Sequence, residues 1–97
     1  MRRDDIINRL RAHQAELRRL GVEHLYLFGS AARDEAGQDS DVDLFFDHPR
    51  GALGLYELMD VKERAGDILG VRADVMTRRS LHPALRAEIE RSAVPVF

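Results

Sequence analysis

Residues 41–76 contain two short apolar runs with strand character, and the helical pattern of residues 54–69 lies between them. Gly70 follows that pattern directly, as expected at the C-terminus of a helix. A helix of this length is long enough to connect two neighbouring parallel strands. Residues 41–46 and 71–76 are therefore predicted to be strands, and if they are parallel neighbours in one sheet, the helix between them is the crossover that the pairing requires.

The rest of the chain predicts further helices and at least one more strand. Apolar residues at helical spacing predict a helix over 4–20, and the aromatic and aliphatic run 24–28 predicts a strand. The other expected elements are a short helix over 30–35, a polar loop over 37–40, a turn over 48–51, a helix over 81–91 and a closing edge strand over 93–97. This order predicts an α/β (α+β) fold, with a small mixed sheet flanked by helices.

The composition is that of an ordinary globular protein, with 97 residues, 44% of them hydrophobic and 33% charged. This length predicts a single domain, residues 1–97. No apolar run approaches the ~20 residues that span a bilayer, and the charged N-terminus does not resemble a signal peptide. The chain has no cysteine, which excludes disulfides and thiolate metal sites. We expect a cytoplasmic protein that does not bind membranes.

Three aspartates are predicted to gather on one surface of the sheet. Alternation along a strand puts Asp41 and Asp43 on the face opposite Val42 and Leu44. Asp74 is placed in the same way in the next strand, so its carboxylate joins the other two if the strands are neighbours. Carboxylate oxygens are the ligands that Mg²⁺ and Mn²⁺ prefer, and three of them have the capacity for two ions. A solvated strand face is the alternative for any one of these acids.

Gly29 and Ser30 lie where the first predicted strand gives way to a helix. Such a turn presents free backbone N–H groups, which bind phosphate, and a glycine allows a ligand to come close to the backbone. Ser30 has the hydroxyl to bind a phosphate oxygen, although a serine here is more commonly only a helix N-cap. The pattern is not a Walker P-loop, because its lysine and spacing are absent.

The combination of Gly29-Ser30 with Asp41-x-Asp43 resembles the signature of the polymerase-beta-type nucleotidyltransferase superfamily. The stretches 27–33 and 40–44 both fit its minimal members, and Asp74 fits the third carboxylate of the family. The resemblance covers nearly the whole chain, and the length is similar to that of MNT-type antitoxins, which pair with a helical HEPN ribonuclease toxin. It implies a polymerase-beta-like nucleotidyltransferase fold.

The resemblance also implies a reaction. ATP would lie with its phosphates on Gly29 and Ser30, and two Mg²⁺ ions (or Mn²⁺) would be held by Asp41 and Asp43, with Asp74 joining one of them. These three aspartates would be the catalytic and metal-binding residues of a Mg-dependent protein adenylyltransferase. The implied product is a HEPN toxin neutralised by AMP on a tyrosine. Whether Asp74 is also the base stays open.

Other residues have two interpretations. Arg33 either contacts the triphosphate or forms a salt bridge with Asp39 or Glu35. Asp47 is interpreted as a solvated strand end, and Phe45 as a core aromatic that also walls the nucleotide pocket. The four histidines show no metal-binding spacing and are expected at the surface or in packing contacts, namely His13, His24, His48 and His82.

Two rival functions and the docking surface stay open. The rivals are a small-molecule adenylyltransferase and a non-catalytic antitoxin that acts by occlusion. The candidate surfaces for the toxin are the arginines of the first helix and the tail Val94 to Phe97, and the alternative is a solvated helix face and a tail packed on its own sheet. We expect no direct nucleic-acid binding, and the sequence leaves a homo-oligomer open.

Overall fold

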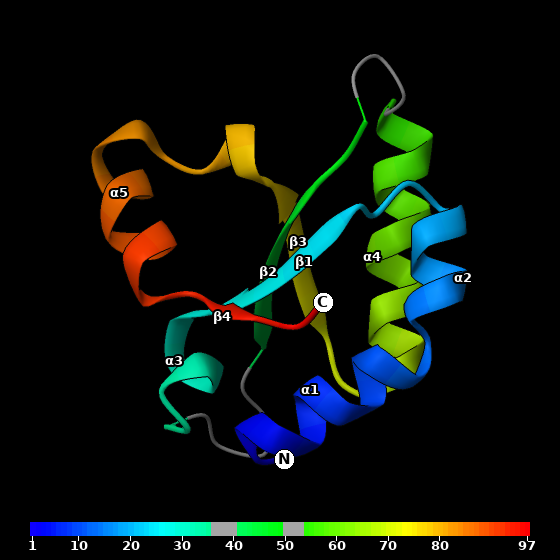
Figure 1. The fold of residues 1–97 in the computed structure, drawn as a ribbon, viewed down its shortest axis with the longest axis horizontal. Coiled ribbons are helices and arrows are strands. Elements are labelled where there is room, and N and C mark those ends of the chain that lie inside the picture. Colours follow the sequence, from blue (N-terminus) through cyan, green and yellow to red (C-terminus); the bar gives the residue numbers. More distant parts are fainter. Residues whose placement is uncertain (36–40, 50–53) are drawn as a thin grey trace.

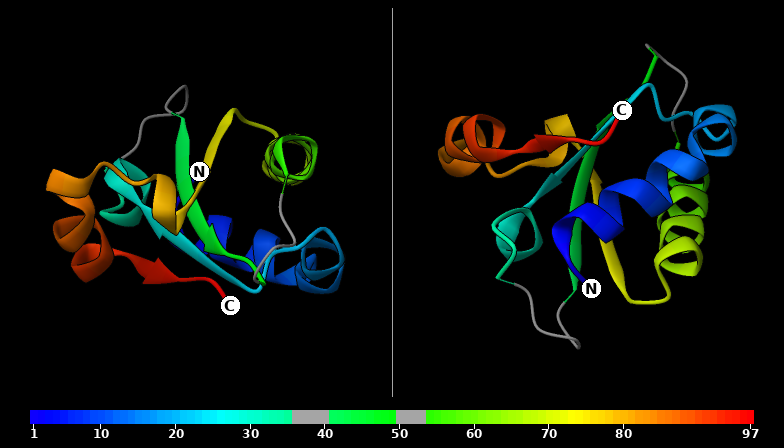
Figure 2. Two further views of the ribbon diagram at one scale, coloured as in Figure 1. Left: turned by 90° about the horizontal axis from the view of Figure 1, so that it is seen from above. Right: turned by 60° about the horizontal axis from the view of Figure 1, so that its bottom comes forward.

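The computed structural model describes residues 1–35, 41–49 and 54–97, which form a four-stranded sheet with helices on both of its faces (Figures 1 and 2). The elements in chain order are α1 (Arg3–Ala12), α2 (Gln14–Arg19), β1 (His24–Phe28), α3 (Gly29–Ala32), β2 (Val42–Asp47), α4 (Leu55–Leu69), β3 (Ala73–Thr77), the 3₁₀ turn η1 (Arg78–Ser80), α5 (Pro83–Ser92) and β4 (Val94–Pro95). The strand order across the sheet is β3-β2-β1-β4. β2 and β3 are parallel, and β1 is antiparallel to both β2 and β4. The predicted mixed sheet, with α4 connecting two parallel neighbours, is confirmed.

α4 forms because its sequence has a continuous apolar face and a glycine at the position that ends the helix. Val61, Ala65 and Leu69 recur every fourth residue and are buried against the sheet. The helix ends at Gly70, which adopts φ +70° and donates its N–H to the carbonyl of Gly66 at 2.8 Å. This helix returns the chain from the end of β2 to the start of β3, so the two parallel strands begin at the same end of the sheet.

The two faces of the sheet are covered differently. Helices α1, α2 and α4 cover one face and enclose the main core, while α5 lies over the other (Figure 1). The largest fully buried side chains of the main core are Ile6, Leu10, Leu17, Leu25, Leu27, Leu44, Phe46 and Leu69. On the second face Phe28, Phe45 and Leu81 form a smaller cluster, in which the ring of Phe45 stacks on Tyr26 with centroids 4.8 Å apart.

Some predicted boundaries were wrong. The helix expected over 4–20 is broken at His13, whose backbone is not helical, because no large apolar side chain between Leu10 and Leu17 holds that turn against the sheet. α3 spans Gly29–Ala32, so it begins one residue before the expected helix over 30–35 and ends three residues before the end of that helix, and β3 begins at Ala73 after a bend. The turn η1 was not predicted. The expected loop over 37–40 and part of the turn over 48–51 lie outside the described residues.

The tail is part of the fold and is not a free docking surface. β4 pairs with β1, and Val96 is fully buried in the main core. Arg11 of α1 donates to the carbonyl of Val96, and Arg18 of α2 lies over the ring of Phe97. The tail therefore packs on its own sheet, which was the alternative for that surface, and two of the arginines, Arg11 and Arg18, contact the tail. Among the described helices, none has the length and apolar character needed to cross a membrane.

Candidate active site

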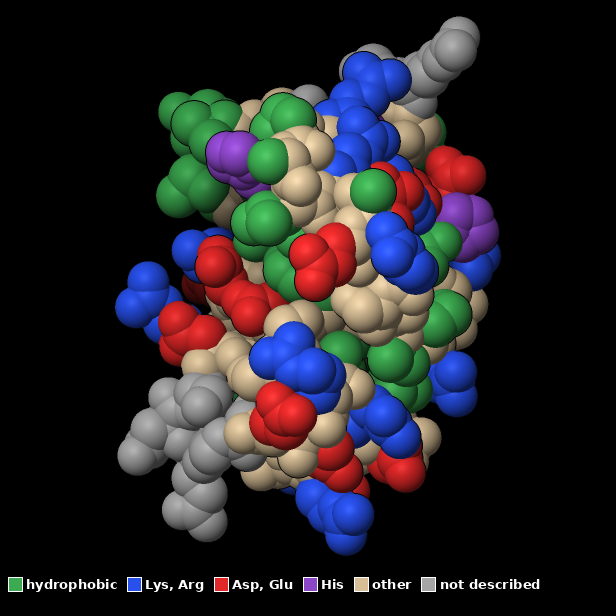
Figure 3. All heavy atoms as spheres, turned by 90° about the vertical axis from the view of Figure 1, so that its left-hand side faces the viewer, with side chains coloured by type: hydrophobic (Ala, Val, Ile, Leu, Met, Phe, Trp, Pro, Cys, Tyr) green, Lys and Arg blue, Asp and Glu red, His purple; other side chains and the backbone are tan. Residues whose placement is uncertain are grey.

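Asp43 and Asp74 are direct neighbours across the two parallel strands. They are partners in the register of β2 and β3, so their Cα atoms are separated by about the 4.8 Å spacing of adjacent strands. Both belong to the face opposite the main core, because Val42 and Leu44 on β2, and Ala73 and Val75 on β3, are buried on the other side. Figure 3 shows this side of the molecule, where several acidic side chains lie close together in one area and others are scattered over the rest of the face. The predicted convergence of these two carboxylates is observed.

The pKa of Asp43 is raised above its ordinary value. Burial of the half-buried carboxyl is the largest cause, and the negative charges of Asp74 and Asp41 add to it. No cation of the described residues is paired with Asp43, so the site has an excess of negative charge. An arrangement of this kind favours a bound cation.

Gly29 is the residue that leaves room for Asp43. Its backbone has φ +75°, which side-chain-bearing residues rarely adopt. A Cβ atom at this position would overlap Oδ2 of Asp43 and lie 3.2 Å from its Cγ. Residue 28 of β1 is also the register partner of Asp43, so β1 delivers Gly29 and the start of α3 directly beside the carboxylate. Gly29, half-buried Ser30 and Asp43 are therefore brought together as predicted.

Asp41 lies just before β2 and is exposed. Its carboxylate faces Arg72, 3.8 Å from Nε, and both side chains are largely in solvent. Within residues 1–35, 41–49 and 54–97, no three acidic or histidine side chains are grouped closely enough to hold a metal ion as they stand. Asp43 and Asp74 are thus brought together, whereas the expected convergence of all three acids is not observed, because Asp41 faces Arg72.

Arg33 forms a salt bridge with Glu35, which is one of the two interpretations given for it. Its Nε donates to Glu35 at 3.0 Å, and 59% of its side chain is exposed. The other suggested partner, Asp39, is outside the described residues, as is Ser40. Exposure leaves the guanidinium free to move toward a phosphate, at little cost in stability.

Two interpretations on the same sheet face were wrong, one of them only in part. Phe45 is a core aromatic as predicted, fully buried between Tyr26 and Phe28, but for that reason it does not wall a pocket. Asp47 is not a solvated strand end, because it accepts two hydrogen bonds from Arg78, at 2.7 and 3.1 Å. The signal that would have found this pair is the strand register, which continues one step beyond Phe46 and Thr77.

The histidines lie at the surface or contact neighbouring polar groups. His13 contacts Glu16 at 3.3 Å, and His24 lies 3.8 Å from Glu23. His82 accepts the N–H of Ala84 and caps α5. His48 contacts the carbonyl of Pro49. Each contact is local in the chain, as expected for residues without a metal-binding role.

Comparisons with known proteins agree with this geometry. The nucleotidyltransferase domain family matches residues 10–96. The chain is 35% identical to the protein adenylyltransferase MntA of Thermococcus cleftensis over 94 residues, which is 96% of this chain and 94% of that protein. It also superimposes on the solved structure of a minimal nucleotidyltransferase with a TM-score of 0.84 and 35% identity, covering 98% of this chain and 96% of the other.

A more distant likeness concerns the fold alone. A chain of the same fold is found in the complex of a tri-AMPylated HEPN toxin from Shewanella oneidensis with an MNT antitoxin. The two chains superimpose with a TM-score of 0.62 and 16% identity, over 98% of this chain and 71% of the other. The family is shown by the match over residues 10–96 and by the relatives that are 35% identical. The chain belongs to the nucleotidyltransferase domain family, as its paired aspartates and Gly29 had indicated.

Proposed function

We propose that this protein transfers AMP from ATP to a tyrosine hydroxyl of a partner HEPN toxin and thereby neutralises it. The single observation that carries the proposal is the register of Asp43 with Asp74, beside a glycine whose missing side chain leaves space for the carboxylate. The relationship to a protein adenylyltransferase supports AMP as the transferred group.

Mg²⁺ fits the donor set of this site. Asp41, Asp43 and Asp74 offer hard oxygen ligands, and the pKa of Asp43 is raised first by burial of its carboxyl and then by the negative charges of Asp74 and Asp41. These three residues would hold two Mg²⁺ ions, or two Mn²⁺ ions instead. When bound, divalent ions supply charge stabilisation for the entering and leaving oxygens of a phosphoryl transfer.

The protein's own residues position the reactants. Gly29 and Ser30 receive the triphosphate where the backbone is open to close approach, and Arg33 swings from Glu35 to a phosphate oxygen. A bond forms between the acceptor oxygen and the α-phosphorus, the bond from the α-phosphorus to the bridging oxygen breaks, and pyrophosphate leaves. Asp74 is exposed on the edge strand, and in this proposal it accepts the proton of the attacking hydroxyl.

The acceptor is the part of the proposal that depends most on relatives. The antitoxin in the Shewanella complex is bound to a toxin that carries AMP groups, and it has the fold of this chain. A tyrosine hydroxyl must come within about 3–3.5 Å of the α-phosphorus, so the toxin has to dock against the sheet face that carries Asp74.

The test is transfer of labelled AMP. The protein is incubated with α-labelled ATP, Mg²⁺ and the toxin encoded beside it, and the toxin is analysed by mass spectrometry. We expect a mass increase of one or more AMP groups on a tyrosine peptide. Asp43→Asn with Asp74→Asn is the catalytic control. Label on neither the toxin nor the protein, with AMP instead attached to an added small molecule, would favour the small-molecule rival; inhibition of the toxin without any label would favour occlusion.

A further inference from the structure

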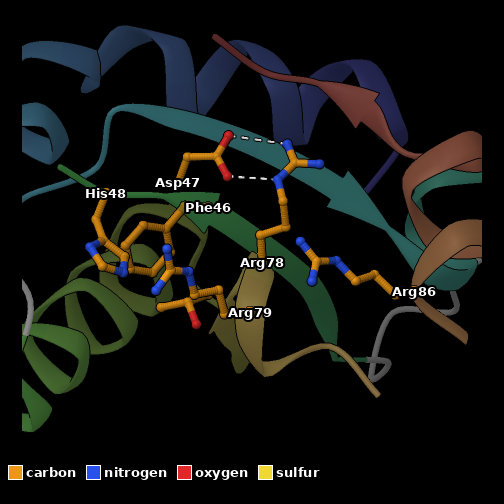
Figure 4. Close-up of a pocket in the computed structure, with 7 residues that line it drawn as sticks. Phe46, Asp47, His48, Arg78, Arg79 and Arg86 are labelled. Atoms are coloured by element: carbon orange, nitrogen blue, oxygen red, sulfur yellow. Dashed lines mark hydrogen bonds and ion pairs between the residues drawn. The ribbon is translucent and has the colours of Figure 1, made fainter. Parts of the chain in front are cut away.

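A second hollow lies away from the paired aspartates. A cavity of about 460 Å³ is lined by residues at the ends of β2 and β3, by η1 and by Arg86 of α5 (Figure 4). Asp47 in its wall follows Asp43 by four residues on the same strand, a distance of about 13 Å at the usual strand rise. The cavity is therefore separate from the proposed catalytic centre.

Arg78 is held rigidly in the wall of this cavity. Asp47 accepts two of its hydrogen bonds, and Glu90 of α5 accepts a third at 2.7 Å. The guanidinium carbon also lies 4.9 and 5.0 Å from the ring centroids of Tyr26 and Phe45. These contacts raise the pKa of Arg78 further, so the guanidinium is permanently charged and fixed in place.

The other two arginines leave the cavity with an excess of positive charge. Arg86 donates to Glu90 at 2.8 Å and shares it with Arg78. The cavity wall thus contains three guanidinium groups and the carboxylate of Asp47, with Glu90 of α5 as a further acid paired to two of them. Arg79 is exposed and has no ion pair with any residue in the three described ranges. In Figure 4, Arg78 extends to Asp47, Arg86 extends toward the Arg78 side chain, and Arg79 lies beside Phe46 and His48.

We propose that this cavity binds a small anion that carries a phosphate group, at a site distinct from the one used for AMP transfer. Its volume is within the range of sites for small molecules, about 300–1,000 Å³. A guanidinium presents a planar pair of donors that matches phosphate oxygens, and Arg79 has its donors available. A rigid hollow with one uncommitted arginine favours a compact anion over an acidic protein segment, which needs a longer surface.

The test is calorimetric titration of the protein with inorganic phosphate, pyrophosphate and AMP, in EDTA so that no divalent cation contributes. We expect pyrophosphate and AMP to bind. Arg79→Gln should weaken binding about tenfold or more, the effect of losing one charge-assisted contact, and Arg86→Gln should weaken it as well. Arg19→Gln, the same change on the exposed surface of α2, should have no effect, and neither should Arg33→Gln near the catalytic aspartates.

The three ligands distinguish the sources of the phosphate. Binding of all three assigns the site to phosphate itself, and binding of AMP alone assigns it to a nucleotide. No binding at millimolar concentration would overturn the proposal. Binding that survives Arg79→Gln but is lost in Arg33→Gln would also overturn it, because the anion would then be at the Gly29 end of the sheet. Asp43→Asn with Asp74→Asn abolishes transfer in the proposed mechanism but should leave this binding intact, so the two proposals fail independently.

Discussion

At the scale of single residues, the position of Asp43 depends on Gly29. The carboxylate of Asp43 lies beside the start of α3, and only a residue without a side chain at position 29 leaves space for it. Gly29 also adopts a positive φ, which lets the chain turn from β1 into α3. One glycine thus meets a steric and a conformational requirement at once, and the chain offers a second glycine that separates the two.

Gly29→Ala is expected to abolish AMP transfer, while Gly70→Ala is not. Both residues have φ near +70°, so both alanines should destabilise the fold by about 1 kcal/mol. A Cβ at Gly70 meets nothing within 4 Å, whereas at Gly29 it displaces the carboxylate of Asp43. Urea unfolding measures the shared loss, and the labelled-ATP assay measures the difference. Equal activity of the two variants would show that the position of Asp43 is not critical.

Asp43→Asn is expected to stabilise the metal-free protein at neutral pH. The raised pKa of Asp43 means that the folded state disfavours the carboxylate, so the stability of the wild type increases as pH falls through that pKa. The gain from the variant should therefore be largest at pH 7 and vanish below the ordinary aspartate value of 3.8. Thermal melts in EDTA from pH 7 to pH 3 measure it. Asp60→Asn on the exposed surface of α4 is the matched control and should show no comparable gain.

At the scale of elements, the pairing of β2 with β3, continued into η1, positions the charged side chains at both ends of this sheet face. The register that pairs Asp43 with Asp74 continues to Phe46 and Thr77, and the next step brings Asp47 to Arg78. Arg78 then joins α5 to the sheet through Glu90. α5 has no fully buried residue of its own, so this ion pair contributes much of its attachment.

Arg78→Ala is expected to destabilise the protein by about 2 kcal/mol, because it leaves Asp47 and Glu90 without their partner and exposes Tyr26 and Phe45. Arg86→Ala is the control, since its pair with Glu90 is within one exposed helix and is worth about 0.5 kcal/mol or less. Urea unfolding compares the two variants. Similar losses would mean that α5 is held by its apolar contacts instead.

The elements also show what sequence reasoning could reach. The bounds of β1 and of α4 could be predicted because alternation and helical spacing are local signals. The meeting of Asp43 with Asp74 could be predicted only on the condition that the two strands joined by the crossover helix are neighbours, which the register confirms. The break at His13 and the Arg78–Asp47 pair could not, because both depend on how distant segments pack. Phe45 was placed on the correct face, but its burial depends on α5, which no pattern in β2 reveals.

At the scale of the whole molecule, unequal cover of the sheet creates the site. One face is closed by α1, α2 and α4, and α5 lies over the other (Figure 2). That second face also carries the aromatic cluster and the exposed Asp74. The acids therefore remain accessible on a sheet whose reverse side is a complete core. Because the acids are fixed on the sheet, a bound cation can offset the repulsion between their carboxylates without any change of fold.

Mg²⁺ with ATP is therefore expected to raise the melting temperature of the wild type more than either ligand alone. A ligand at 100 times its dissociation constant stabilises by about 2.7 kcal/mol, which is several degrees or more for a domain of this size. Asp43→Asn with Asp74→Asn should abolish the increase, although the metal-free variant should be at least as stable as the wild type, since these groups repel each other. Arg79→Gln, outside the catalytic end of the sheet, should leave the Mg²⁺-dependent part of the increase unchanged. If the double variant kept that part, the ion would be bound elsewhere, and the roles proposed for both aspartates would have to be withdrawn.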